Sequence, residues 1–150
     1  MKKFKESPLV ESVDKDFVNG GLIDGWSGAA LFMVAMFNTT KDEKYLDFAQ
    51  ILLDFDLNRC QRANDNTIQY KDDEGRLMPY LLGGSAGIAM VTAELNTIMH
   101  EDKYDSFLKY ASNITKYRCT YDTGLFRGFS GILELDNVLS NYKKMTDGLQ

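Results

Sequence analysis

The chain has 150 residues, 44% of them hydrophobic and 26% charged, which is enough for one domain with its own core. Its formal net charge of −5 argues against a nucleic-acid-binding protein, and the spacing of Cys60 and Cys119 matches no metal-binding motif. No apolar segment follows the basic N-terminal residues, and the longest apolar run, residues 29–37, is too short to span a bilayer. We therefore expect a cytoplasmic protein with two free thiols and no membrane span.

Three short stretches of the chain share the pattern G-x-[SA]-G, and each precedes an apolar run. They begin at Gly25, Gly84 and Gly128, so the first two are 59 positions apart and the last two are 44 apart. The 59-residue offset also aligns three pairs of identical residues: Lys44 with Lys103, Tyr45 with Tyr104, and Phe48 with Phe107. Matches in one register indicate an internal repeat.

The first repeat, residues 21–57, predicts two helices. The first covers about residues 27–38, and we expect it to be buried on every side because residues 29–37 include no polar face. Thr40 and Glu43 have the spacing of a capping box, which predicts that the second helix begins there. The apolar residues of this second helix recur at helical spacing opposite a polar face, so we expect an outer helix.

A polar connection, residues 58–80, joins the first repeat to the second. Within it, residues 67–70 and 76–77 flank the turn-forming residues 72–75 and predict a small β-hairpin. The second repeat, residues 81–118, predicts an inner helix over about 85–97 and an outer helix over about 103–117, with His100 at a helix end.

The third repeat, residues 124–150, is expected to be truncated. Its inner helix covers about residues 130–142, and Thr146 stands where an outer helix would begin. Glu134 and Asp136 are expected to be exposed because a neighbouring helix is missing. Buried helices that alternate with amphipathic ones predict an all-α fold, in which residues 1–18 lead into an incomplete α/α toroid of about two and a half helix pairs over residues 19–150. An α-solenoid is the alternative.

These residues resemble the lanthionine synthetase C-like (LanC-like) family. The resemblance rests on the G-x-x-G at each inner helix start, on the phrase NTTKDEKYLDFA, and on RLMPYLLGGSAGIAMV at residues 76–91. The last stretch is most similar to the cyclase part of class III lanthipeptide synthetases, which are kinase–cyclase fusions. The resemblance covers about residues 19–147, less than half of a family domain, so we expect a piece of a larger domain that is inactive by itself.

What the resemblance implies is lanthipeptide biosynthesis, in which Cys thiols of a precursor peptide add to dehydrated Ser and Thr residues. The implied partners are the precursor peptide and the kinase and lyase domains of the same or a neighbouring chain; a homo-oligomer is a further alternative. Zinc-dependent relatives carry a Cys where this chain has Leu82, and Cys-His where it has Phe126 and Arg127. We therefore predict no zinc and no other cofactor.

The candidate site lies where the inner helices begin. Helix N-termini carry unpaired N–H groups, and glycine allows close backbone approach, so the paired glycines indicate tight packing, alone or together with anion binding. These glycines are Gly25, Gly28, Gly84, Gly87, Gly128 and Gly131. Ser27, Ser85 and Ser130 are candidates for capping the same helix starts.

Three residues beside the glycine pairs are the candidate catalytic groups. Tyr80 or Asp24 could transfer a proton, and Arg127 could hold a carboxylate or stabilise developing negative charge. A structural or solvated role is the alternative for each. Two other functions stay open: a non-catalytic peptide-binding or scaffold protein, and an α/α-barrel carbohydrate enzyme, although only Asp24 lies where such an enzyme would have paired carboxylates.

Overall fold

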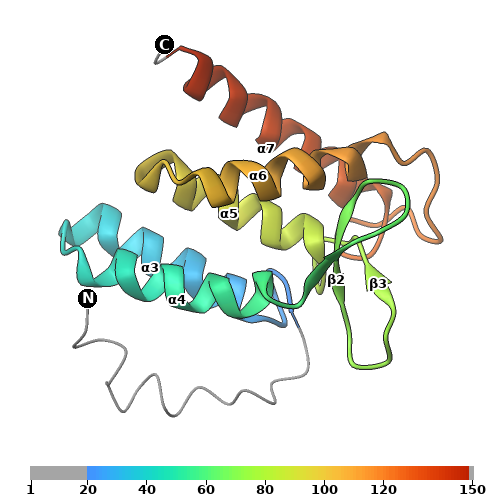
Figure 1. The fold of residues 1–150 in the computed structure, drawn as a ribbon, viewed down its shortest axis with the longest axis horizontal. Coiled ribbons are helices and arrows are strands. Elements are labelled where there is room, and N and C mark those ends of the chain that lie inside the picture. Colours follow the sequence, from blue (N-terminus) through green and yellow to red (C-terminus); the bar gives the residue numbers. More distant parts are fainter. Residues whose placement is uncertain (1–19, 149–150) are drawn as a thin grey trace.

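The computed structural model describes residues 20–148, so the expected lead-in over residues 1–18 lies outside the described part. Helices dominate what is described, which confirms the expected helical character (Figure 1). They are α3 Trp26–Thr40, α4 Lys44–Leu57, α5 Ser85–Met99, α6 Asp102–Ala111, the 3₁₀-helix η1 Ser112–Lys116, and α7 Phe129–Asp147. Among residues 20–148, no helix is both long and apolar enough to cross a membrane.

In chain order, a small antiparallel sheet follows the first helix pair and precedes the second. Its strands are β1 Cys60–Arg62, β2 Ile68–Lys71 and β3 Leu77–Met78, in the order β1-β2-β3. The predicted hairpin is confirmed, with Tyr70 opposite Met78 and Lys71 opposite Leu77. Strand β1 is not predicted from the sequence, because its three residues carry no alternating apolar pattern.

The inner helices form a row in which α5 lies between α3 and α7, while α4 packs on α3 and α6 packs on α5 (Figure 1). This arrangement explains which inner helix is most buried. Ten of the fifteen residues of α5 are buried, because α5 has neighbours on both sides. A row of helix pairs is compatible with the expected all-α class, and closure into a toroid stays a proposal.

The expectation that the first inner helix is buried on every side is wrong. Only Ser27, Ala30 and Val34 of α3 are buried, and Phe32 is 60% exposed. The reason is that α3 packs chiefly on α4 and α5, and the side of α3 that faces away from them stays exposed within residues 20–148. An apolar surface shows that a helix can pack against neighbours on that side, but it does not show which neighbours are present.

The 59-residue repeat is present in the backbone as well as in the sequence. Lys41 directly follows α3 and His100 directly follows α5, and both of these cap residues adopt left-handed backbone angles, with φ of 58° and 53°. Leu57, the last residue of α4, and Lys116, the last residue of η1, are also 59 apart. The expected helix-end position of His100 is confirmed.

Two helix boundaries differ from the prediction. The capping box is wrong, because Thr40 is still part of α3 and its hydroxyl donates to the Met36 carbonyl at 2.8 Å. Instead, the carboxylate of Asp42 accepts the Lys44 N–H at 3.1 Å. The expected outer helix over about 103–117 is α6 followed by the tighter turns of η1.

The third inner helix is longer than predicted. Helix α7 runs to Asp147, so Thr146 does not begin a new element, and its hydroxyl donates to the Tyr142 carbonyl at 3.2 Å. A residue with left-handed backbone angles follows each of the helices α3 and α5, but no such residue interrupts α7 within residues 129–147. Glu134 and Asp136 are exposed on α7, as expected.

Candidate functional site

The paired glycines permit tight chain entry into each inner helix. A Cβ on the second glycine of each pair would overlap a carbonyl oxygen six residues earlier in the chain. The three equivalent contacts are Gly28 with Leu22, Gly87 with Leu81, and Gly131 with Leu125. The first glycines, Gly25, Gly84 and Gly128, are equally crowded by backbone atoms of the loops that precede them. Packing therefore accounts for all six glycines, because only a residue without a side chain fits there.

Backbone hydrogen bonds join the three loops that precede the inner helices. The Ile23 N–H donates to the Leu82 carbonyl at 3.0 Å, and the Leu82 N–H donates to the Phe126 carbonyl at 2.9 Å. These three residues occupy the same position, two before the first glycine of each pair. The loops thus lie side by side, and we call this series of bonds the loop ladder.

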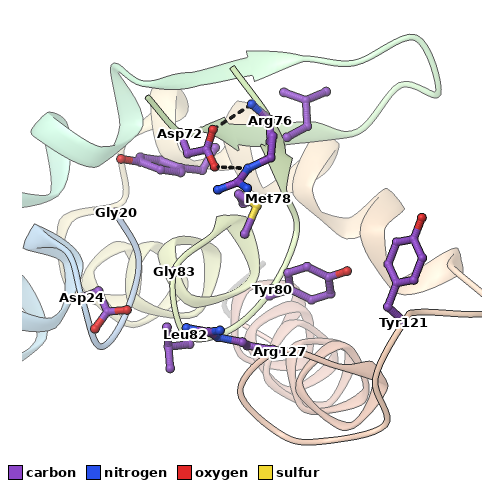
Figure 2. A pocket seen from close by; sticks show the side chains of 12 residues that line it. Gly20, Asp24, Asp72, Arg76, Met78, Tyr80, Leu82, Gly83, Tyr121 and Arg127 are labelled. Atoms are coloured by element: carbon purple, nitrogen blue, oxygen red, sulfur yellow. Dashed lines mark hydrogen bonds and ion pairs between the residues drawn. The ribbon is translucent and has the colours of Figure 1, made fainter. Parts of the chain in front are cut away.

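A pocket of about 510 Å³ lies where these loops meet the β2–β3 hairpin (Figure 2). Asp24, Tyr80 and Arg127 all line it, so the structure brings the three candidate catalytic residues to one cavity. Each comes from a different one of the segments that precede the inner helices. Their catalytic roles remain predictions, since their shared location does not demonstrate a reaction.

The opposite wall of the pocket carries a charged pair that the sequence analysis did not identify. The Arg76 Nε atom donates to Asp72 Oδ2 at 2.7 Å (Figure 2). Another Arg76 guanidinium nitrogen lies 2.8 Å from a Glu74 oxygen. Arg76 is therefore engaged by the turn of its own hairpin. Arg127 is exposed and forms no ion pair with any residue of the 20–148 range, so its guanidinium is available to a ligand.

The helix N-termini use their first donors inside the protein. The Ser27 N–H donates to the Asp56 carboxylate, the Ala86 N–H to the Pro79 carbonyl, and the Phe129 N–H to the Asp122 carbonyl. One early N–H of each inner helix is thus occupied inside the protein and is not available to an anion. Arg127 offers the pocket a cation that could bind an anionic group.

The expected serine caps are wrong, because the three helices have glycine at the N-cap and no side-chain cap. The serines instead tie the helix starts to other segments. The Ser27 hydroxyl donates to Asp56, the Ser85 hydroxyl accepts the Tyr70 N–H, and the Ser130 hydroxyl donates to the Thr123 carbonyl. The Ser85 bond links α5 to β2 and so holds the sheet beside the pocket.

Asp56, which the sequence analysis missed, supports the Gly20–Asp24 wall of the pocket. Its side chain is buried, and Oδ2 accepts the Gly21 N–H at 3.1 Å in addition to both Ser27 donors. Burial raises the pKa of this carboxyl above its ordinary value, although the hydrogen bonds from Ser27 and Gly21 oppose the shift. No local sequence signal identifies Asp56, because its partners are about thirty residues away in the chain.

The two cysteines lie in different environments. Burial raises the pKa of the Cys60 thiol to about 12, which disfavours the nucleophilic thiolate, and Cys119 is exposed. Within the described residues, no three side chains from His, Cys, Asp and Glu gather closely enough to hold a metal ion. At the positions where zinc-dependent relatives carry ligands, Leu82 and Phe126 offer no donor atom and Arg127 offers a cation, so these residues do not fit zinc.

Comparison with known proteins found one informative similarity. No protein-family model matches the chain. The chain is 34% identical over 127 residues to a probable SapB synthase of Streptomyces coelicolor. The match covers 82% of this chain but only 13% of that synthase, so the chain spans a small part of its relative's length. Over most of its length, the chain is therefore related in sequence to one segment of a SapB synthase.

Proposed function

We propose that this chain belongs to the cyclase-like part of a lanthipeptide synthetase and that its pocket holds a dehydrated peptide during ring formation. The observation that carries the proposal is the similarity to a SapB synthase over 82% of the chain. The pocket supports it, because charged and aromatic side chains from three equivalent loops line one cavity large enough for a short peptide segment.

The reaction would add a cysteine thiol to the double bond of a dehydroamino acid. The sulfur forms a bond to the β-carbon, the thiol proton leaves, and the α-carbon gains a proton through an enolate. Arg127 would stabilise the negative charge that develops on the enolate oxygen. Asp24 would accept the thiol proton and Tyr80 would supply a proton to the α-carbon. A proton would then pass from Asp24 to Tyr80 through solvent water, which restores both groups and balances the reaction.

The proposed mechanism uses no zinc. In zinc-dependent relatives the metal would activate the thiol, but the residues at the corresponding positions of this chain do not fit that metal. Thiol activation would then depend on proton acceptance at the pocket and on holding the two reacting groups together, which by itself accelerates a reaction strongly.

A non-catalytic peptide-binding role is the second candidate function. One observation favours it: Arg76 is engaged by Asp72 and Glu74, so Arg127 is the pocket-lining cation that remains available. Such a pocket could bind the carboxylate of an acidic side chain or of the C-terminus of a peptide without promoting the addition of a thiol.

The test uses a synthetic peptide that contains one dehydroalanine and one cysteine. The peptide is incubated with the complete synthetase to which the proposal assigns the chain, because the isolated chain is expected to be inactive. Free thiols are counted by alkylation and mass spectrometry. Thiol loss without a change in peptide mass, faster than in the protein-free control, would support cyclisation. Saturable binding with no added thiol loss would support the scaffold role, and absence of both would contradict the proposal.

A further inference from the structure

A second cavity, of about 400 Å³, adjoins the pocket that contains the candidate catalytic residues. Tyr80 and Tyr121 line both cavities, and Figure 2 shows them at the end of the first pocket opposite to Asp24. The volume of the second cavity lies in the range of ligand pockets in proteins, roughly 300–1,000 Å³. We call this cavity the side pocket; its lining residues are Pro79, Tyr80, Tyr117, Cys119, Thr120 and Tyr121.

The two cavities differ in the chemistry of their walls. Two aspartates and two arginines line the first pocket, whereas none of the residues that line the side pocket is Asp, Glu, Lys, Arg or His. Three tyrosines and a proline supply most of the side pocket's wall. Such a wall favours an apolar side chain, and an aromatic one above others, because aromatic rings attract each other in offset and edge-to-face arrangements.

The Tyr117 side chain is held in place by hydrogen bonds to the sheet segment. Gln69 Nε2 donates to the Tyr117 hydroxyl at 2.7 Å, and this hydroxyl donates to Asp65 Oδ2 at 2.6 Å. Gln69 lies in β2, and Asp65 lies in the turn between β1 and β2. Because these bonds engage its hydroxyl, Tyr117 offers the side pocket mainly a ring in a fixed position.

The segment that leads into α5 forms a second fixed wall. Tyr80 follows Pro79, whose carbonyl accepts the Ala86 N–H at 3.2 Å. It precedes Leu82, whose N–H and carbonyl both take part in the loop ladder. The backbone on each side of Tyr80 is therefore bonded, so the side pocket is preformed and a ligand has little ordering to impose.

The remaining wall belongs to the loop that joins η1 to α7. The Thr120 hydroxyl donates to the Asp122 carbonyl, which also accepts the N–H of Phe129, the first residue of α7, at 3.0 Å. The side pocket thus lies between the segment that enters α5 and the loop that enters α7. Both belong to the interior of the helix row, so the cavity does not depend on which neighbours the first and last helices have.

We propose that the side pocket binds an aromatic side chain of the same peptide whose dehydroamino acid occupies the first pocket. This inference rests on the proposed function, because it assumes that the first pocket holds a peptide. An extended peptide advances about 3.3 Å per residue, so a side chain within about three residues of the dehydroamino acid can reach an adjoining cavity. The side pocket would then determine which dehydroamino acid of a precursor lies beside Arg127.

Binding of unreactive peptides to the complete synthetase tests the side pocket without any reaction. Each peptide has alanine in place of dehydroalanine and serine in place of cysteine, and carries one Phe at a chosen position within three residues of that alanine. In calorimetric titrations, at least one Phe position should bind about tenfold more tightly than the all-alanine peptide, because a buried aromatic ring leaves water. A Lys at the same position should give no such gain.

Cys119 reports occupancy of the side pocket, because it lines this cavity and is exposed. Its alkylation by iodoacetamide, followed by mass spectrometry of the fragment that contains it, should be slowed by the Phe peptide and not by the alanine peptide. Cys119→Trp, which fills the cavity, should abolish the advantage of Phe over alanine. Arg118→Trp is the matched control and should keep it, since Arg118 is exposed and lines neither cavity. Circular dichroism checks that both variants are folded.

Three results would overturn the inference: equal affinity for the Phe and alanine peptides at every position, tighter binding of the Lys peptide, or a Phe advantage that leaves Cys119 unprotected and survives Cys119→Trp. Parallel assays with the reactive peptides separate this inference from the proposed reaction. Ring formation without any preference for Phe would refute the side pocket alone. A Phe advantage in binding with Cys119 protected, but without ring formation, would support the side pocket and contradict the cyclisation.

Discussion

The Oδ2 atom of Asp56 accepts both the backbone N–H of Ser27 at 2.8 Å and the Ser27 hydroxyl at 2.6 Å. Asp56 lies in the last turn of α4, and Ser27 lies in the first turn of α3. The contact therefore closes the first helix pair at the end that faces the pocket. Since the same oxygen accepts the Gly21 N–H, it also positions the loop that carries Asp24.

Replacing Asp56 should destabilise the fold. Asp56→Ala leaves the N–H groups of Gly21 and Ser27 and the Ser27 hydroxyl without their buried acceptor, so we expect a loss of about 3 kcal/mol in the free energy of unfolding. Urea unfolding measures the loss. Asp136→Ala, at an exposed position on α7, is the matched control and should change stability by less than about 0.5 kcal/mol. An equal effect of the two substitutions would contradict the role of Asp56.

The buried carboxyl of Asp56 should also make stability depend on pH. Burial raises its pKa in the folded state, so the folded protein binds this proton more tightly than the unfolded chain does. The stabilisation is fully present below the carboxyl's ordinary pKa and is lost as the pH rises through the raised pKa. Relative to Asp56→Asn, the wild-type protein should therefore lose stability over this range in urea titrations. A difference that is constant with pH would disprove the raised pKa.

Adding a methyl group at a paired glycine should disrupt an inner helix start. In Gly87→Ala, the new Cβ would overlap the Leu81 carbonyl oxygen and lie 2.8 Å from the Leu22 Cβ, so we expect a loss of about 3 kcal/mol. Gly124→Ala is the control, because the nearest atom to its Cβ would be 3.5 Å away, an ordinary contact. Thermal unfolding of both variants compares the two sites, and equal melting temperatures would refute the packing role.

Tyr117 should control the titration of Asp65. Hydrogen bonds from Thr67 and Tyr117, each 2.6 Å long, lower the pKa of the Asp65 carboxyl. Tyr117→Phe removes one of them, so the Asp65 pKa should rise toward its ordinary value in a ¹³C NMR titration. Because a lowered pKa gives stability that is lost as the pH falls through it, the variant should also lose less stability on acidification. Tyr45→Phe, which leaves both bonds intact, should not change the Asp65 pKa.

The sequence predicted those features that have local signals. Glycine pairs mark the helix starts, apolar spacing marks the helices, and the turn residues 72–75 mark the hairpin, because each reflects backbone preferences over a few residues. The extent of burial was not predictable in the same way. Phe32 and Val91 occupy equivalent positions in similar helices, yet only Val91 is buried, since burial depends on which helices lie alongside.

The candidate site was likewise predictable only in part. Asp24, Tyr80 and Arg127 could be selected because each lies beside a repeated glycine pair. Asp72 and Arg76 could not be selected in this way. The sequence of the hairpin does not show that the hairpin packs beside the N-termini of the inner helices. Asp56 was missed for the same reason, as its role depends on a partner in another helix.

The most direct test of the central claim is the rate of ring formation by the complete synthetase carrying Arg127→Gln, measured with the dehydroalanine and cysteine peptide. If Arg127 stabilises the enolate, the rate should fall by about a hundredfold while the protein remains folded. Arg118→Gln is the matched control, since Arg118 is exposed and does not line the pocket, and its rate should equal that of the wild-type protein. Ring formation at an unchanged rate in Arg127→Gln would contradict a catalytic role for this pocket.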